Sequence, residues 1–408
     1  MEMKRLYFLL TLALLGCEKE NFLEPILPVT TDCITCYDRF INYNQPSWKL
    51  DFPMIHKKYY HSVTPNGPDW GPPIDFLVVD YDHDGYLDAV TGDSDYTAGF
   101  AGQSTRRKFK FFKGDADGNL VLDTRPEYMN HVGPNFGARS FIGDYNLDGK
   151  PDLVFVGSGH DDQTGQSTES WKDAPIIFMS NAEGFYDRRT YPEAAGSYHH
   201  GSSADIDNDG DLDIVLPRWA LMRNRGDGTF DVEPFPIETE DDPTTLELAD
   251  LNRDGIIEFI YGSGTMYQPP GVYRHQSWIA NIGGPKKIIP HVDNFGIFLD
   301  ADFIDLDGDG TLEILVDRAT DQNHPKGHWR GWYIQVLKVT DTEVLDVTDT
   351  YIEDNEYVCG NNCDQLGQTW VHWFNISTDK FGDTYYFADD GISKARWKLV
   401  NGKFKRVL

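Results

Sequence analysis

The sequence predicts an all-β protein, a β-propeller built from four-stranded blades. Three observations favour this fold. An acidic nine-residue motif, Asp-x-Asp/Asn-x-Asp-Gly-x-x-Asp/Glu, occurs five times, at intervals of 45 to 64 residues. Short apolar runs flank the copies, and helical periodicity is nowhere sustained. Hairpins with Asp-Gly, Glu-Gly or Asn-Gly turns recur between the copies.

The apolar runs predict the first two strands of each repeat. Residues 76–79 and 87–90 flank the first motif, residues 212–216 follow the third and residues 312–316 follow the fifth. Such runs, rich in Val, Ile, Leu and Phe and bounded by Gly and Asp, are typical of buried strands. The recurring hairpins supply the other two strands, at residues 111–118, 178–185, 221–230 and 398–404.

Six such repeats are expected to close radially, which leaves few exposed strand edges. We therefore predict six blades, or seven if residues 48–63 contribute strands. Residues 1–16 are assigned to a signal peptide, residues 17–36 to a lipidated cysteine and tether, residues 37–69 to an N-terminal segment that can complete a blade, and residues 70–408 to the propeller.

The five motifs supply oxygen ligands at positions 1, 3, 5 and 9. The candidate metal ligands are Asp80, Asp82, Asp84 and Asp88; Asp144, Asn146, Asp148 and Asp152; Asp205, Asp207, Asp209 and Asp213; Asp250, Asn252, Asp254 and Glu258; and Asp305, Asp307, Asp309 and Glu313. A degenerate sixth copy keeps this spacing as Asn375, Ser377, Asp379 and Asp383 but has lost the glycine.

Calcium is the ion that this ligand set favours, because Ca²⁺ takes six to eight oxygen ligands in a flexible cage. The glycine at position 6 permits a sharp chain reversal, and the carbonyl at position 7 can add a ligand. The alternative is an acidic turn that binds nothing. Five copies with one spacing argue against it, since closely packed carboxylates repel one another without a cation. We expect about five structural calcium ions.

These motifs and hairpins resemble the FG-GAP/VCBS repeat family, whose propellers include the integrin α-subunit head. The resemblance covers roughly residues 70–408 and implies calcium-binding propeller repeats.

The N-terminus predicts export and lipidation. Lys4 and Arg5 precede an apolar run at residues 6–15, which is too short to span a bilayer as a helix. The sequence Leu-Leu-Gly-Cys that ends at Cys17 resembles the lipobox of bacterial lipoproteins, which implies diacylation of Cys17. The alternative is an ordinary signal peptide with a coincidental cysteine. We expect a lipid-anchored outer-membrane protein exposed at the cell surface, with a periplasmic orientation as the alternative.

Four further cysteines, Cys33, Cys36, Cys359 and Cys363, are disulfide candidates in an exported protein. A four-thiolate zinc site is the alternative interpretation. The formal charge of −30 argues against nucleic acid as a partner, because nucleic acid is bound through clustered Lys and Arg.

A ligand, a glycan or a protein, is expected on the face opposite the acidic loops, where long connections between the second and third strands emerge. The residues five positions before the first metal ligand should ring the channel mouth there. From this ring and the connections above it we select Arg139, His200, Arg218, His275, Trp329 and Trp370 as candidate ligand-binding residues. Polar residues at strand starts are the simpler explanation.

Two classes of function remain open. The first is a non-catalytic binding module, acting alone or as a subunit of an outer-membrane complex. The second is a propeller-type lyase acting on an anionic glycan, for which Tyr198, His199, His200 and Arg218 offer the required residue types. No motif fixes these four residues as a catalytic set, so the binding module is preferred and no catalytic residue is assigned.

Overall fold

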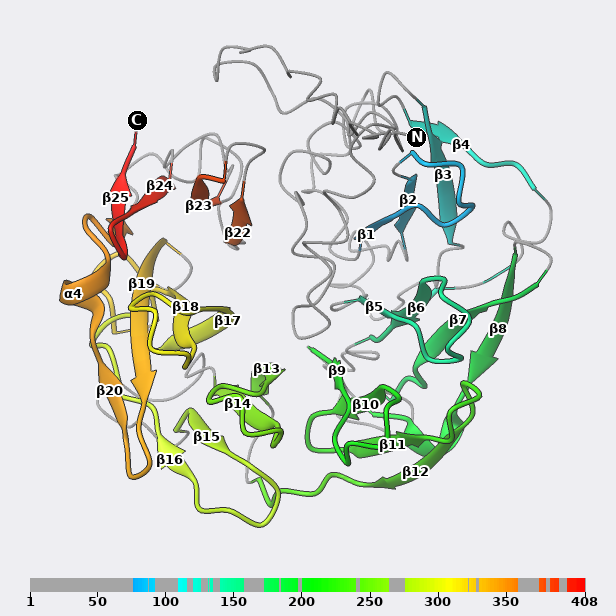
Figure 1. Ribbon diagram of the computed structural model, residues 1–408, viewed down its shortest axis with the longest axis horizontal. Coiled ribbons are helices and arrows are strands. Elements are labelled where there is room, and N and C mark those ends of the chain that lie inside the picture. Colours follow the sequence, from blue (N-terminus) through cyan, green and yellow to red (C-terminus); the bar gives the residue numbers. More distant parts are fainter. Residues whose placement is uncertain are drawn as a thin grey trace, which may run out of the picture.

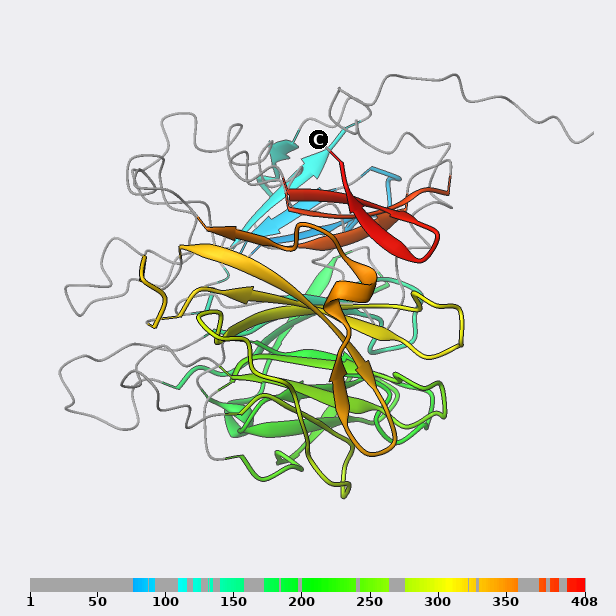
Figure 2. The ribbon, with the colours of Figure 1, turned by 90° about the vertical axis from the view of Figure 1, so that its left-hand side faces the viewer.

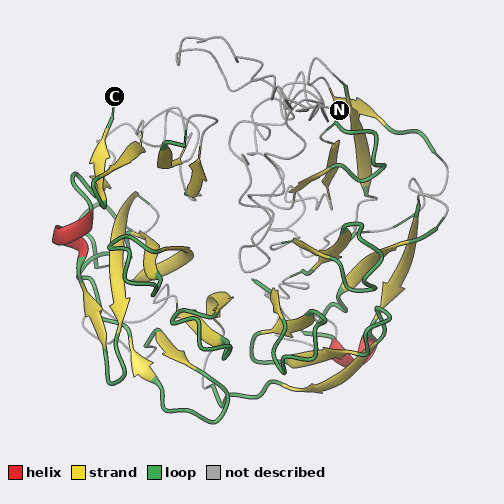
Figure 3. Ribbon diagram, in the orientation of Figure 1, coloured by secondary structure: helices red, strands yellow, loops and turns green. Residues whose placement is uncertain are grey.

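The computed structural model is nearly all β, as predicted (Figure 3). It describes residues 76–86, 88–91, 109–115, 120–125, 131, 133–134, 140–157, 172–182, 185–196, 200–239, 243–263, 276–321, 323–327, 330–358, 374–378, 382–388 and 395–407. Within these ranges the helices are one 3-10 turn, η4 (Pro192–Ala194), and one short helix, α4 (Thr348–Tyr351).

The strands of the first three sheets come from consecutive stretches of chain. The first sheet contains β1 (Phe76–Val79), β2 (Asp88–Thr91), β3 (Lys110–Gly114) and β4 (Leu120–Leu122). The second contains β5 (Phe141–Gly143), β6 (Asp152–Phe155), β7 (Ile176–Ser180) and β8 (Tyr186–Thr190). The third contains β9 (Ser202–Ala204), β10 (Asp213–Leu216), β11 (Ala220–Asn224) and β12 (Phe230–Pro234).

The other three sheets follow the same plan. The fourth contains β13 (Pro243–Ala249), β14 (Glu258–Ser263), β15 (Trp278–Ala280) and β16 (Lys287–Ile288). The fifth contains β17 (Ile297–Ile304), β18 (Glu313–Ala319), β19 (Gly331–Val339) and β20 (Val344–Asp346), with β21 (Glu356–Val358) paired to β19. The sixth contains β22 (Asn375–Thr378), β23 (Thr384–Ala388), β24 (Ala395–Val400) and β25 (Lys403–Arg406).

Each sheet is an antiparallel meander in which neighbouring strands pair in chain order. Figure 1 shows the six described sheets following one another around a common centre, with the first strand of each sheet innermost. Seen from the side in Figure 2, the strands run across the thickness of this ring. The arrangement is that of a propeller-like all-β fold.

The hydrophobic core lies between neighbouring sheets. Leu248 and Phe259 of the fourth sheet pack with Val215 and Leu221 of the third, and all four side chains are buried. Similar clusters join the first three sheets, the fourth to the fifth, and the fifth to the sixth. Since an inner strand has a neighbouring sheet on both sides, it is apolar on both faces, which explains the short continuous apolar runs in the sequence.

The predicted hairpins are confirmed at β3–β4, β7–β8, β11–β12 and β24–β25. The last of them turns at Asn401 and Gly402, with φ of 52° and 73°. A two-residue turn with both φ angles positive matches the right-handed twist of the flanking strands. Among the described residues, no helix has the length and apolar character needed to cross a membrane.

Candidate metal loops

Five acidic loops connect the first strand of a sheet to its second strand. We call them loop 1 (residues 80–88), loop 2 (144–152), loop 3 (205–213), loop 4 (250–258) and loop 5 (305–313). Because every sheet repeats the same strand order around one centre, these connections emerge on one face of the ring.

The first aspartate organises each loop. In loops 1 to 4 its two carboxylate oxygens accept hydrogen bonds of 2.9–3.1 Å from the backbone N–H groups of positions 5 and 6. In loop 5 the donors to Asp305 are Gly308 N and Gly310 N, at 2.7 and 3.1 Å. The position-5 carboxylate in turn accepts a bond from the N–H of position 7 in all five loops. The loop backbone therefore wraps around its own carboxylates.

The glycine at position 6 has the role predicted for it. Its φ angle lies between 79° and 100° in all five loops, a region that L side chains rarely adopt. Position 4 is also left-handed, with φ of 56° to 60° in loops 1 to 4. This second reversal could not be predicted from the sequence, because only loop 5 has a glycine at position 4, Gly308. The other loops have His83, Leu147, Asn208 and Arg253 there.

The acid at position 9 is the most buried ligand and it also closes the loop. Asp88, Asp152, Asp213, Glu258 and Glu313 each accept a bond of 2.7–3.2 Å from the N–H of position 2. The three aspartates use their other oxygen to accept an N–H from the third strand, at 2.6–2.9 Å. Position 9 therefore ties the loop to the sheet whether or not a cation is bound.

The electrostatics of the loops favour a bound cation. Burial raises the pKa of Asp88 to about 8 and that of Asp152 to about 6, against the opposing effect of their backbone hydrogen bonds. Burial also raises the pKa values of Asp80, Asp213, Glu258 and Glu313. Neighbouring loop carboxylates add to the upward shift for Asp88, where Asp82 and Asp80 contribute. A cation bound among these oxygens would offset both the burial of the carboxylates and their mutual repulsion.

Three loops bring acidic ligand atoms within 4.8 Å of one another. The groups are Asp80, Asp82 and Asp88 in loop 1; Asp205, Asp207 and Asp209 in loop 3; and Asp305, Asp307 and Glu313 in loop 5. Loops 2 and 4 have an asparagine at position 3, Asn146 and Asn252, whose amide oxygen is also a hard donor. The residues present fit a calcium ion in each loop.

A basic side chain from the third strand reaches into loops 1, 3 and 5. In loop 1, Lys113 contacts Asp82. In loop 3, Arg223 Nη1 lies 3.1 Å from Asp207 and 2.9 Å from Asp213. In loop 5, Lys338 Nζ lies 2.6 Å from Asp307. The residue that follows each loop pairs with a residue of the third strand, and the basic residue comes directly after that partner. In loops 2 and 4 that place holds Met179 and Asn281.

This alternation balances charge. The loops with a third-strand base have aspartate at position 3, and the loops without one have asparagine there. The four ligand positions and the third-strand position together carry a net formal charge of −3 in each of the five loops. These five positions therefore carry the same formal charge in every loop despite their different sequences.

The sixth repeat is aligned differently from the sequence prediction. Asn375 and Ser377 are ladder residues of β22, paired with Phe387 and Tyr385, so they do not begin a loop. The ladder of β22 with β23 runs on to the pair of Thr378 and Thr384, so the connection between these strands is three residues shorter than in the other five sheets. The nine-residue motif therefore does not fit this connection, and Asp379 lies outside the described residues.

One segment of the chain matches a known family. Residues 144–216 match the FG-GAP-like repeat. The match begins at the first ligand of loop 2 and ends three residues beyond the last ligand of loop 3. No curated protein matches the chain. The resemblance inferred from the motifs is thereby supported for the second and third sheets.

The candidate ligand-binding residues are placed only in part. Arg218 is exposed, in the turn between β10 and β11, and His200 is completely buried before β9. Their roles stay predictions. Arg139, His275, Trp329 and Trp370 lie outside the described residues, as do Cys17, Cys33, Cys36, Cys359 and Cys363.

Proposed function

We propose that this chain is a calcium-stabilised β-propeller of six blades that acts as a non-catalytic binding module. The observation that carries the proposal is the shared geometry of five acidic loops, each between the first two strands of a sheet. Calcium in these loops would neutralise carboxylates whose burial otherwise opposes folding. A cage of oxygen ligands without an open coordination position would serve stability rather than chemistry.

The binding face is the one opposite the metal loops, and a basic and aromatic patch on it favours an anionic ligand. Lys172 Nζ lies 4.5 Å from the ring centroid of Trp219, and the guanidinium carbon of Arg218 lies 5.5 Å from it. Lys172 comes from the connection between β6 and β7, and Arg218 and Trp219 from the connection between β10 and β11. Both connections follow the second strand of a sheet.

The charge of this patch is unusual for the molecule. The chain carries a formal charge of −30, so two exposed cations over one half-buried indole form a local positive site on an acidic protein. A carboxylate or sulfate of a glycan, or an acidic segment of a protein, would meet both cations while a sugar ring or apolar side chain covered the indole. We take an anionic glycan as the ligand class.

The location that suits this function is the outer surface of the cell, with the chain held by lipid on Cys17. The lipobox-like residues before Cys17 support this. Changing Cys17 to Ala should stop incorporation of labelled lipid and release the protein from the detergent phase. A variant that still enters the detergent phase as the wild type does would rule out this anchor.

Binding is tested with soluble uronate-containing, sulfated and neutral polysaccharides. The double variant Lys172→Ala/Arg218→Ala should lose binding to the anionic polysaccharides. Lys286→Ala is the matched control, because Lys286 makes a similar contact with Trp278, at 4.7 Å, away from the patch. Equal binding by the double variant and the control would refute this ligand site. An unsaturated product, detected by absorbance during incubation, would favour the lyase instead.

A further inference from the structure

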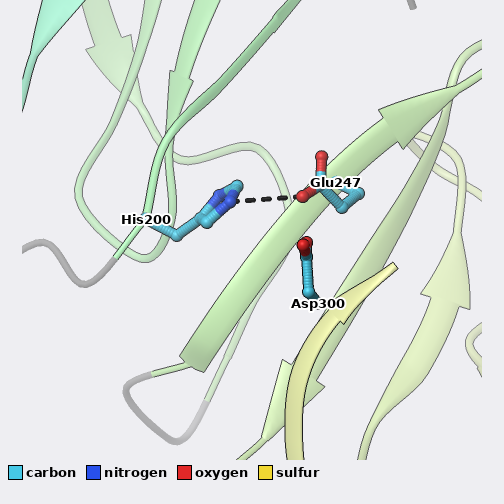
Figure 4. Close-up of side chains that lie close together, drawn as sticks. All are labelled: His200, Glu247 and Asp300. Carbon is cyan, nitrogen blue, oxygen red and sulfur yellow. Dashed lines mark ion pairs between the residues drawn. The ribbon is translucent and has the colours of Figure 1, made fainter. Parts of the chain in front are cut away.

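A second cluster of metal-ligating side chains lies away from the acidic loops, among the innermost strands. His200 precedes β9, Glu247 lies in β13 and Asp300 lies in β17. Their exposed fractions are 0%, 0% and 1%. Figure 4 shows the three side chains converging from three successive sheets, with the His200 imidazole directed at the Glu247 carboxylate.

The spacing within the cluster allows its three residues to coordinate one ion. One donor atom from each residue lies within 4.8 Å of the other two, and His200 Nε2 lies 3.2 Å from Glu247 Oε1. Bonds of about 2.0 Å to a tetrahedral zinc ion would place two donors about 3.3 Å apart. The histidine and the glutamate are thus already separated as two ligands of one ion would be.

The negative charge of the cluster also favours a bound cation. Two carboxylates face one imidazole, so the three groups carry a negative charge even when the histidine is protonated. Asp300 pairs directly across the strands with Asp317, and Asp302 follows on β17; both of these side chains are buried. Burying ionised carboxylates is costly unless opposite charge accompanies them.

The backbone at this level departs from a regular ladder. The register of β17 with β18 shifts between Phe298 and Asp300, immediately before the ligand. The register of β13 with β14 shifts between Pro243 and Thr245, two residues before Glu247. Bulges of this kind re-aim side chains and are frequent beside functional sites. The acidic loops lie at the other ends of these strands, so neither register shift is required to form them.

We propose that His200, Glu247 and Asp300 bind one zinc-like divalent transition metal at the centre of the ring. An imidazole nitrogen with two carboxylate oxygens suits zinc, whereas calcium prefers oxygen ligands alone. Three protein donors leave one coordination position for water or for a ligand group. The site is independent of the five calcium loops and would be filled when they are already saturated.

The test uses the full chain without a histidine tag. The protein is stripped with a chelator, returned to excess calcium chloride to fill the loops, and given zinc chloride. Zinc is then measured by mass spectrometry after gel filtration. The wild type should retain one zinc ion per chain. Cobalt(II) in place of zinc should give the visible absorption bands of a four-coordinate site, and zinc should abolish them.

Two variants of similar shape separate this site from the loops. Glu247→Gln/Asp300→Asn should lower zinc retention by at least about tenfold. Asp207→Asn/Asp307→Asn, which changes only loops 3 and 5, should leave zinc retention unchanged while weakening calcium binding. Melting in calcium checks that both variants fold.

Two results would overturn the proposal. One is a wild-type protein that retains no zinc and shows no cobalt bands in excess calcium. The other is a folded Glu247→Gln/Asp300→Asn variant that holds as much zinc as the wild type. If that variant fails to fold, the wild-type cobalt spectrum still decides, because its bands report a four-coordinate site and thiolate ligands would add an intense charge-transfer band that nitrogen and oxygen ligands lack.

Discussion

Lys338 Nζ lies 2.6 Å from Asp307 Oδ2, within the ligand set of loop 5. The same ammonium lies 2.7 Å from Asp309 Oδ2 and 3.3 Å from Glu313 Oε1. These contacts lower the pKa values of Asp307 and Asp309 and raise that of Lys338. A tethered cation therefore occupies oxygens that calcium would use, and it competes with the ion.

Lys338→Met should make loop 5 bind calcium more tightly and should lower the melting temperature in chelator. The methionine keeps the length of the side chain but removes the competing charge. Calcium titration by calorimetry measures the first effect and a melting curve measures the second.

Lys398→Met is the matched control for that variant. Lys398 lies in the third strand of the sixth sheet, opposite Tyr385, and forms an ion pair with Asp383 outside the five calcium loops. Calcium binding should not change. Weaker calcium binding by Lys338→Met would show instead that the lysine supports the bound form of the loop.

Much of this fold could be predicted because each repeat contains residues that mark its turns and its buried strands. Asp-Gly at positions 5 and 6 fixes a reversal, and the apolar runs beside it have the length of buried strands. The sixth repeat could not be aligned from its acids. Its acidic residues are spaced like ligands, but Asn375 and Ser377 pair within the β22–β23 ladder and the connection that follows is too short for the motif.

The cluster of His200, Glu247 and Asp300 could be predicted from the sequence only in part. His200 and Asp300 share one repeat position, five residues before a first metal ligand, whereas Thr245 occupies that position in the fourth repeat. Glu247 lies two residues further along β13, and only the packing of three sheets shows that it meets the other two. The third-strand bases were missed for the same reason, because strand register and not sequence spacing brings them to the loops.

Gly149→Ala should destabilise the protein by about 1–2 kcal/mol, the cost of a left-handed L residue. The φ angle of Gly149 is 79°, and no atom lies within 4 Å of an added Cβ, so the loss comes from the backbone alone. Gly149→Asn should lose less, since asparagine tolerates this region better. Urea unfolding in calcium compares the two. Equal losses would mean that the φ angle is not what selects glycine there.

Asp152→Asn should destabilise the protein both in calcium and in chelator, by about 1–3 kcal/mol in the latter. The two carboxylate oxygens of Asp152 accept N–H groups from Tyr145 and Ser180 at 2.7 and 2.6 Å. Asparagine has only one acceptor oxygen, so one of these N–H groups would face an NH2 group that cannot accept its bond. Asp148→Asn, in the same loop but exposed, should reduce only the gain from calcium. Urea unfolding with and without calcium separates the two effects. If both variants lost stability only in calcium, position 9 would be merely a metal ligand.

The central claim is that the five loops bind calcium, and calcium titration of the stripped full chain tests it most directly. Exported sites of this kind often have dissociation constants of about 10⁻⁴ to 10⁻³ M, so calcium at ten times that value should add about 1.4 kcal/mol of stability per site. Equilibrium dialysis should find about five calcium ions per chain, and the melting temperature should rise with calcium and fall again with chelator. A chain that binds no calcium, with a melting curve indifferent to calcium and chelator alike, would contradict the account.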